Sequence, residues 1–428
     1  MCVGDKGYDE ARLFICLHLG SLAMRRLALV WTRLTFLSLF VFDAVLLPVM
    51  AGEPWQRHCI DDSFRGADGV RLGDFNGDGL PDVTTGWEES GIVRLYLNPG
   101  PEKADKPWSA VTLAKAASPE DAVPIDVDGD GRLDVVSCHE GGKRQVLVHW
   151  NDAEDATLDS QLLDPESWST SAFDALDGQR WMFALPLGKI NGRTAIVVAS
   201  KNANASITLL LSPGDGPAKA ARDLNAWQVI RLRDAGWVMS LRAVDMDHDG
   251  RLDIVFSDRK GSKAIAGWLR QPADVNQPLQ SKGAWTEFPI AGRGKEVMFL
   301  AANRQRCLIA LRGGASLDAT ATDGAGDWQV SAFKHPGGIV NGKAIEAFPD
   351  QRVVMTFNTA ASQRKSDPGI WLREPATADG VASWFVIDPT PAVKFDRMEL
   401  VDLNGDGKLD VMTCEERQNL GVVWYQQP

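Results

Sequence analysis

The chain has 428 residues, of which 44% are hydrophobic and 24% are charged, a composition typical of a folded globular protein. Its formal net charge of −12 argues against phosphate-backbone binding as the main function, so nucleic acid is not an expected partner. Forty glycines and 22 prolines favour many short strands and turns and argue against a helical bundle.

Residues 1–51 have the features of a secretory leader, with Met24 as a possible start. Two arginines follow Met24 and precede an apolar stretch that ends in residues of the kind a signal peptidase reads. The alternative is a membrane anchor, which Arg33 and Asp43 disfavour because they lie inside the stretch. We therefore expect a mature chain of residues 52–428 that is exported to the periplasm, the cell surface or the medium and does not span a membrane.

Four nine-residue segments share one pattern of acidic residues and glycine. Oxygen-bearing side chains fall at positions 1, 3, 5 and 9, and glycine stands at position 6. A run of strand character comes before and after each segment, so each one is predicted to be a loop between two strands. The segments are residues 74–82, 126–134, 245–253 and 402–410.

A second marker is a tryptophan that opens a short run of strand character. Successive tryptophans of this kind lie 43 to 60 residues apart, which divides the chain into seven units of about four strands each. They are Trp55, Trp108, Trp168, Trp227, Trp285, Trp328 and Trp384. Seven such sheets in a ring leave only short, protected edges. The sequence therefore predicts an all-β fold, a seven-bladed β-propeller with four-stranded blades over residues 52–428.

The two ends of the predicted propeller fit a closed ring. The chain opens with one tryptophan strand at residues 55–60 and stops after residues 422–425, where the next tryptophan strand would be due. We expect the opening strand to complete the last blade as its outer strand. An open solenoid, the alternative, would need capping units at both ends, and the sequence contains no such units.

The acidic segments are predicted to bind metal ions. Alternate spacing lets a tight loop turn its side-chain oxygens inward, and position 7 adds a backbone carbonyl, at Leu80, Arg132, Arg251 and Lys408. Flexible sites with six or seven ligands, all of them oxygens, favour Ca²⁺ over Mg²⁺. The alternative is a set of Asx-rich turns without metal. Fourteen carboxylates in four matching arrays would repel one another without cations, which favours about four Ca²⁺ sites.

These segments resemble the FG-GAP/VCBS repeats, the family typified by the propeller of integrin α subunits and common in exported bacterial proteins. The resemblance extends over the mature chain and implies a seven-bladed propeller with calcium in loops between the first two strands of certain blades. The implied ligands are Asp74, Asn76, Asp78 and Asp82; Asp126, Asp128, Asp130 and Asp134; Asp245, Asp247, Asp249 and Asp253; and Asp402, Asn404, Asp406 and Asp410. Blades three, five and six depart from the pattern.

A ligand is expected on the face of the propeller opposite the calcium loops. The loops between second and third strands and the loops entering each blade gather there, and they mix both signs of charge with aromatic residues. The candidate ligand-binding residues are Trp87, Glu88, Glu89, His139, Glu140, Trp181, Trp237, Arg259, Glu415 and Glu416. The entering loops add Arg65, Arg180, Lys295, Lys343, Lys394, Phe395, Asp396 and Arg397. The alternative for the tryptophans is packing between blades.

The favoured function is an exported, calcium-binding propeller that serves as a binding module for a glycan or a protein. No catalytic residue is assigned, because the sequence has no nucleophile elbow, zinc-protease motif or phosphate loop. One alternative is a carbohydrate-active enzyme resembling a polysaccharide lyase, with His139 and Glu140 as an acid/base pair at the propeller mouth. A further alternative is a structural scaffold without a small ligand.

Overall fold

The computed structural model describes residues 53–214, 218–273, 284–322, 326–357, 369–377, 380–391 and 393–428. The predicted leader, residues 1–51, lies outside these ranges. Within them, no helix is both long enough and apolar enough to cross a membrane.

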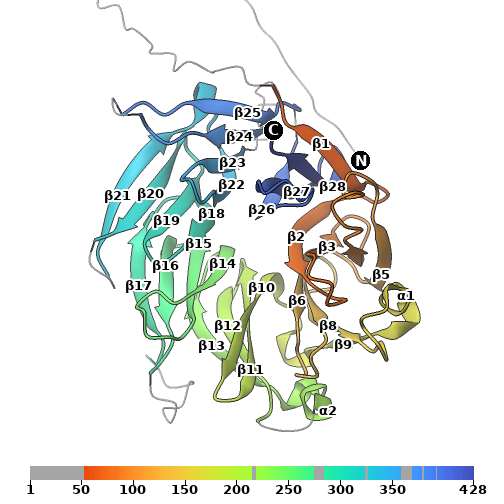
Figure 1. Cartoon of the computed structure of the whole chain (residues 1–428). Helices are drawn as coiled ribbons and strands as arrows, with labels where there is room; N and C mark the ends of the chain where they lie inside the picture. Colours follow the sequence, from red (N-terminus) through yellow and green to blue (C-terminus); the bar gives the residue numbers. More distant parts are fainter. Residues whose placement is uncertain are drawn as a thin grey trace, which may run out of the picture. The chain divides into compact units, whose positions relative to one another are not determined.

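The described chain folds into seven four-stranded antiparallel sheets, which confirms the predicted seven-bladed β-propeller (Figure 1). The strands of each blade are given from the inner to the outer one. Blade one consists of β2 (Ala67–Gly73), β3 (Asp82–Trp87), β4 (Ile92–Leu97) and β5 (Ser109–Lys115), and blade two of β6 (Pro119–Ile125), β7 (Asp134–His139), β8 (Val146–Asn151) and β9 (Trp168–Ala172). Blade three consists of β10 (Arg180–Ile190), β11 (Arg193–Lys201), β12 (Ser206–Leu211) and β13 (Gln228–Asp234), and blade four of β14 (Val238–Val244), β15 (Asp253–Asp258), β16 (Ile265–Arg270) and β17 (Thr286–Ala291).

The last three blades complete the ring. They are β18 (Val297–Ala302), β19 (Arg306–Leu311), β20 (Ala315–Ala321), β21 (Trp328–Lys334); β22 (Gly342–Ala347), β23 (Val353–Phe357), β24 (Ile370–Arg373), β25 (Trp384–Asp388); and β26 (Phe395–Val401), β27 (Asp410–Glu415), β28 (Gly421–Gln426), β1 (Gln56–Asp61). Two short helices, α1 (Asp159–Leu162) and α2 (Ala218–Ala221), precede the outer strands of blades two and three. Each inner strand contacts the inner strand of the next blade, and β26 contacts β2.

The N-terminal strand closes the ring, as the sequence predicted. β1 pairs antiparallel with β28, with Arg57 opposite Tyr425 and His58 opposite Trp424. The strand begins one residue later than expected, because the backbone N–H of Trp55 donates to the Ile387 carbonyl of blade six instead, at 3.1 Å. Blade seven therefore joins the first and last strands of the described chain.

The tryptophan marker has a structural cause. The marker residues stand at or just before the start of each outer strand, and several donate their indole N–H to a carbonyl in the preceding turn. The indoles of Trp108, Trp168 and Trp227 donate to Ala104, Leu162 and Ala221, at 3.1, 2.9 and 2.7 Å. Each ring thus contributes buried apolar area and fixes the turn that leads into the outer strand.

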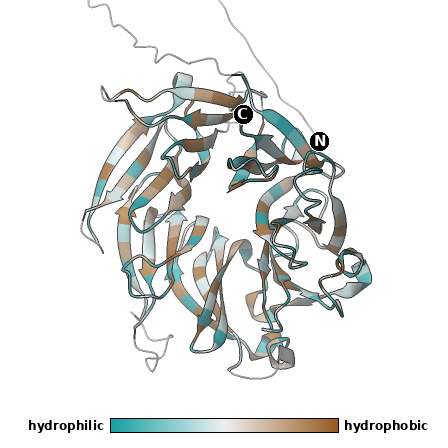
Figure 2. Ribbon diagram, in the orientation of Figure 1, coloured by the Kyte–Doolittle hydropathy of each residue, from teal (hydrophilic) through white to brown (hydrophobic). Residues whose placement is uncertain are grey.

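The second strand of a blade is covered by neighbouring blades, and its residues are accordingly buried. Every residue of β3, β7, β15 and β27 is buried. Hydrophobic residues concentrate on the strands and hydrophilic ones in the connecting loops (Figure 2). Because apolar burial stabilises by about 25 cal/mol per Å², packing between blades accounts for much of the stability of the ring.

Candidate functional site

The four acidic segments join the inner strand to the second strand in blades one, two, four and seven, where the sequence analysis placed them. In each loop the first aspartate accepts at least two backbone N–H groups, and Asp402 accepts three. Asp74 accepts from Gly77 and Gly79 at 2.8 and 3.0 Å. The glycine at position 6 has a positive φ, 83° at Gly79, which a side chain would strain. The loops are therefore built as the tight turns that the spacing predicted.

The aspartate at position 9 ties the loop to its blade. Asp82 is fully buried and accepts from the backbone N–H groups of Phe75 and Asn98, both at 2.8 Å. Burial raises the pKa of Asp82 to about 7 despite these bonds. Burial likewise raises the pKa of Asp134 to about 8 and of Asp253 to about 6. A cation bound beside these carboxylates would lower their pKa values and favour their ionised forms.

The donor set of the loops fits Ca²⁺, although the four loops are not equivalent. In the loops of blades two and four, three carboxylates each have an oxygen within 4.8 Å of an oxygen of the other two. Asp247 of the blade-four loop has a buried oxygen without a hydrogen-bond partner among the described residues. The groups are Asp126, Asp128 and Asp134, and Asp245, Asp247 and Asp253. In blades one and seven, the asparagines at position 3 supply a neutral amide oxygen instead.

Arginines compete for some of these oxygens. The guanidinium groups of Arg132 and Arg251 pair with the position-5 carboxylates Asp130 and Asp249. In blade two, Arg222 also donates to Asp128 at 2.7 Å. The sequence analysis used Arg132 and Arg251 only for their carbonyls, and these pairs show that their side chains already neutralise part of the loop charge.

A pocket of about 260 Å³ lies at the centre of the ring, at the end where the inner strands begin. The acidic loops follow the other end of the same strands, so the pocket and the acidic loops lie at opposite ends of the ring. We call this pocket the central mouth. Each blade contributes one inner-strand residue to it: Asp68, Glu120, Met182, Met239, Met298, Lys343 and Asp396. Loop and flanking residues add Glu88, Glu140, Phe183, Lys201, Trp237, Arg259, Phe299, Arg312 and Lys394.

The mouth has a charged half, formed by residues of blades six, seven, one and two together with Lys201 of blade three. Its three lysines each hold a carboxylate from another element; the pairs are Lys201 with Glu140, Lys343 with Asp396 and Lys394 with Glu416. Glu120 lies 3.7 Å from Lys201. By contrast, the carboxylates of Asp68 and Glu88 form no hydrogen bond or ion pair with any residue that the structure describes. Asp68 is nevertheless only 8% exposed.

Burial and neighbouring charges divide the acids of the mouth into two kinds. Burial, with the Asp396 charge as a second cause, raises the pKa of Asp68 to about 7. Burial and the charge of Asp68 raise the pKa of Glu120 to about 8. At Asp396 burial acts in the same direction, but Lys343 and Lys394 outweigh it and lower the pKa. Lys394 and Lys343 also act to lower the pKa of Asp68, but there they do not outweigh burial, and neither forms an ion pair with Asp68.

The inner strands of blades three, four and five give the mouth an apolar wall, and Lys201, Arg259 and Arg312 of the same blades also line the pocket. Met182, Met239 and Met298 stand at equivalent places in three successive inner strands, with Phe183 and Phe299 beside them. Methionine side chains are flexible and polarisable, so this wall can adapt to an apolar group.

Trp237 stands where the charged half and the apolar wall meet. Its ring centroid lies 4.6 Å from Lys201 Nζ, 4.7 Å from the Arg259 guanidinium and 4.4 Å from Lys260 Nζ. Its buried indole nitrogen has no hydrogen-bond partner among the described residues. Trp237 is therefore a cation-covered ring and not an open stacking platform.

Several residues predicted for this face do not reach the mouth. Trp87 and Trp181 are buried between blades, and their indoles donate to the Tyr96 hydroxyl and the Leu176 carbonyl. The expectation that these rings face a ligand is wrong; the packing alternative holds for both. Trp87 belongs to a hydrophobic cluster that includes Met412 and Trp424 of blade seven, and Trp181 belongs to one that includes Val136 and Cys138 of blade two.

Other candidates serve the scaffold. His139 is fully buried and bonds Ser137 and the Ala117 carbonyl, so it does not reach the mouth as an acid/base group. Glu415 is fully buried and accepts backbone N–H groups from Lys394 and three residues of its own loop. Glu89 pairs with exposed Arg65 outside the mouth. Of the ten candidates, Glu88, Glu140, Trp237 and Arg259 line the pocket, and Glu416 joins it through Lys394.

The sequence analysis missed Asp68, Glu120, Lys201 and the methionine wall. A fixed offset could have found most of them, because Asp68, Glu120, Met239 and Asp396 each stand six residues before the first aspartate of an acidic loop. Lys201 ends the second strand of blade three, which has no acidic loop, so no such marker exists for it.

A larger pocket, of about 590 Å³, borders β1 and β25 and is lined by Trp55, Phe385 and the C-terminal residues. It brings together few ionisable groups. The central mouth is the better candidate because charged groups from several blades converge there.

Comparisons with known proteins agree with this architecture. The model of the FG-GAP-like repeat family matches residues 74–137, which include the first two acidic loops. A streptogramin B lyase structure is 12% identical, with a TM-score of 0.52 over 88% of this chain and 99% of the other. The propeller domain of Cps50 (Swd1) from Myceliophteria thermophila is 10% identical, with a TM-score of 0.53 over 87% and 100%. These likenesses show the fold alone. No curated protein sequence gives a significant match.

Proposed function

We propose that this chain, an FG-GAP repeat propeller, is a calcium-stabilised binding module whose ligand enters the central mouth. The observation that carries the proposal is the convergence of charged groups from several blades on one pocket at the end of the ring away from the acidic loops. In this arrangement calcium supports the scaffold and does not touch the ligand. The partner is a protein or a glycan.

The tryptophan positions favour a protein over a glycan. Sugar stacking needs an open aromatic face. Trp87 and Trp181 are buried, and cations cover the ring of Trp237. The lyase alternative loses its acid/base residue because His139 lies outside the mouth.

Export is part of the proposal and rests on the apolar stretch before residue 52. The four cysteines of the described chain are free, which is compatible both with an exported protein and with a cytoplasmic one. Sequencing the N-terminus of protein recovered from the native host tests export directly. A chain that begins near Gly52 supports it, and an unprocessed cytoplasmic chain contradicts it.

The binding proposal is tested by screening the purified protein, with Ca²⁺ present, against a glycan array and a set of exported proteins of the native host. A ligand found in this way should bind at least about tenfold more weakly to Arg259→Ala, because a charge-assisted hydrogen bond contributes more than 1.4 kcal/mol. Arg65→Ala is the matched control, since Arg65 is exposed on the same face outside the mouth. If the unmodified protein, Arg259→Ala and Arg65→Ala bind the ligand equally well, the binding site lies outside the central mouth.

A further inference from the structure

Two carboxylates that line the mouth, those of Asp68 and Glu88, have no ion pair with any residue that the structure describes. Each mouth lysine is held by a carboxylate other than Asp68 or Glu88. Arg259 and Arg312 on the far side pair with Glu296, at 3.3 and 3.8 Å. Asp68 and Glu88 are left without a partner among the described residues, although burial of an unpaired carboxylate is costly.

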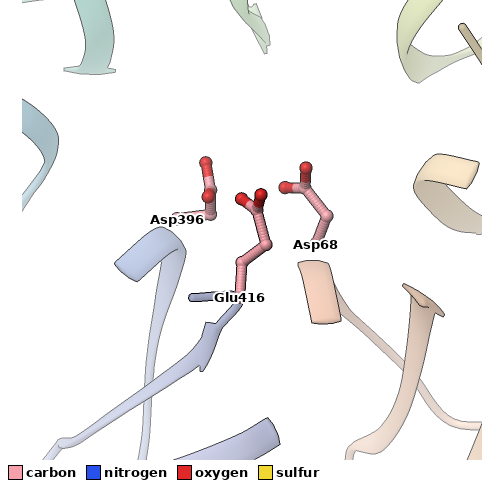
Figure 3. A group of neighbouring side chains, drawn as sticks. All are labelled: Asp68, Asp396 and Glu416. Carbon is pink, nitrogen blue, oxygen red and sulfur yellow. The ribbon is translucent and has the colours of Figure 1, made fainter. Parts of the chain in front are cut away.

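Asp68 is common to two groups of neighbouring carboxylates in the mouth. It contributes an oxygen to each group, and the carboxylate oxygens of a group lie within 4.8 Å of one another. One group is completed by Glu88 and Glu120, and the other by Asp396 and Glu416. Figure 3 shows Asp68, Asp396 and Glu416 directing their carboxylates into a shared space between β2 and β26. A positive group placed there would contact Asp68 and Glu88 without displacing an existing ion pair.

The pocket has the wrong shape and composition for a bare metal ion. Lysine ammonium groups already contact oxygens of Glu140, Asp396 and Glu416, which leaves few carboxylate oxygens for an ion such as Ca²⁺ that needs six to eight oxygen ligands. The cavity of about 260 Å³ has room for an organic group, and the wall facing the acids is made of Met182, Met239 and Met298. A ligand that fits both walls carries a positive charge at one end and an apolar stem behind it.

We infer that the central mouth binds an organic cation on an aliphatic stem, with the charged head at Asp68 and Glu88 and the stem on the methionine wall. A lysine or arginine side chain of a protein partner and a free alkylamine share this chemistry. The inference rests on the proposed function and specifies the chemical class of its ligand. The positive charge of the ligand gives Asp68 the ion-pair partner that it lacks among the described residues.

Calorimetric titration of the protein with small probes, in buffer containing Ca²⁺, tests the inference. The probes are pentylamine against pentanol, and a capped lysine-containing pentapeptide against the same peptide with its lysine acetylated. We expect the charged member of at least one pair to bind and its neutral partner to bind about tenfold more weakly or not at all. Binding of the peptide alone identifies a protein side chain as the ligand, and binding of pentylamine alone identifies a free amine.

Asp68→Asn should abolish this preference for charge while leaving the fold intact or more stable, because it removes a buried, unpaired carboxylate. Asp105→Asn, in an exposed pair with Lys106, is the matched control. Glu88→Gln is the second variant if Asp68→Asn fails to fold, and it should weaken binding of the same probes.

Three results would overturn the inference. Equal binding of charged and neutral probes would reduce the site to a hydrophobic pocket. Binding of Ca²⁺ that Asp68→Asn removes, with no amine binding, would make it a metal site. A screened ligand that is lost with Arg259→Ala but unaffected by Asp68→Asn and Glu88→Gln would leave the proposed function standing and refute only the cation. Insensitivity to all three variants would instead refute the proposed function.

Discussion

A single ion pair links three blades below the mouth. Arg71 of β2 donates to both oxygens of Asp121 in β6, at 2.8 and 2.6 Å, and also approaches the Ala184 carbonyl of β10 at 3.4 Å. The backbone N–H of Ala184 donates back to Asp121 at 3.2 Å. Both side chains are at least nine-tenths buried. The pair therefore fixes the relative positions of the first three inner strands.

Asp121→Ala should destabilise the protein by about 3–5 kcal/mol, because it leaves the buried guanidinium of Arg71 without a counter-charge. The denaturation midpoint in urea, measured with Ca²⁺ present, is the readout. Asp105→Ala breaks an exposed pair with Lys106 and should change the midpoint little. Similar midpoints for the two variants would mean that the Arg71 pair does not hold the inner strands together.

Two buried histidines make the fold sensitive to acid. Ser137 Oγ lies 2.8 and 2.7 Å from Nε2 of His139 and His149. His139 Nδ1 faces the Ala117 carbonyl, an acceptor, so this nitrogen carries the proton. A neutral arrangement satisfies the whole chain of bonds. Burial lowers the pKa of His139 to about 4 and of His149 to about 3.

Because the folded pKa of His139 lies below its unfolded value of about 6.5, the unfolded state takes up the proton first as pH falls. The contribution of His139 to stability is therefore complete above pH 6.5 and is lost progressively towards pH 4, by about 3 kcal/mol in all. His139→Asn should make the unfolding free energy less dependent on pH across this window. An unchanged slope would show that burial does not lower the pKa of His139 in the folded state.

At the scale of elements, the acidic loops and tryptophan strands were predictable because each repeats with a fixed spacing. The loop pattern is set by local backbone bonds, such as those that Asp74 accepts within its own turn. The direction of a side chain at a strand end has no such local cause. Trp87 and Asp68 both lie near the mouth end of blade one, yet one points into the neighbouring blade and the other into the pocket.

β1 is the element on which ring closure depends. It supplies the outer strand of blade seven, and Arg57 and His58 contact Asp388 and Gln426 at 3.3 and 3.1 Å. A truncated chain that begins after Asp62 lacks β1, so the edge of β28 is exposed. An exposed strand edge can pair with another chain and cause aggregation. We expect loss of soluble, folded protein in size-exclusion chromatography. A truncated protein that elutes and melts like the longer chain would show that the ring stays closed with a three-stranded blade seven.

At the scale of the whole molecule, the four acidic loops lie at one end of the ring and the mouth at the other. Stability and ligand binding can therefore be separated. If calcium fills the loops as proposed, its loss leaves the raised-pKa carboxylates Asp82, Asp134 and Asp253 without a neutralising cation. Binding to the native state alone stabilises it by mass action, by about 2.7 kcal/mol for each site at a hundredfold excess over the dissociation constant.

Excess chelator should therefore lower the melting temperature, and Ca²⁺ should restore it far better than Mg²⁺, whose octahedral geometry suits these flexible oxygen loops poorly. The loops of blades two and four gather three carboxylates each, so Asp134→Asn and Asp253→Asn should each remove part of the calcium-dependent shift. Asp68→Asn is the control from the opposite end of the ring, and it should leave that shift intact. A melting temperature that ignores the chelator would mean that Asx turns and the arginine pairs of Arg132 and Arg251 hold the loops without metal.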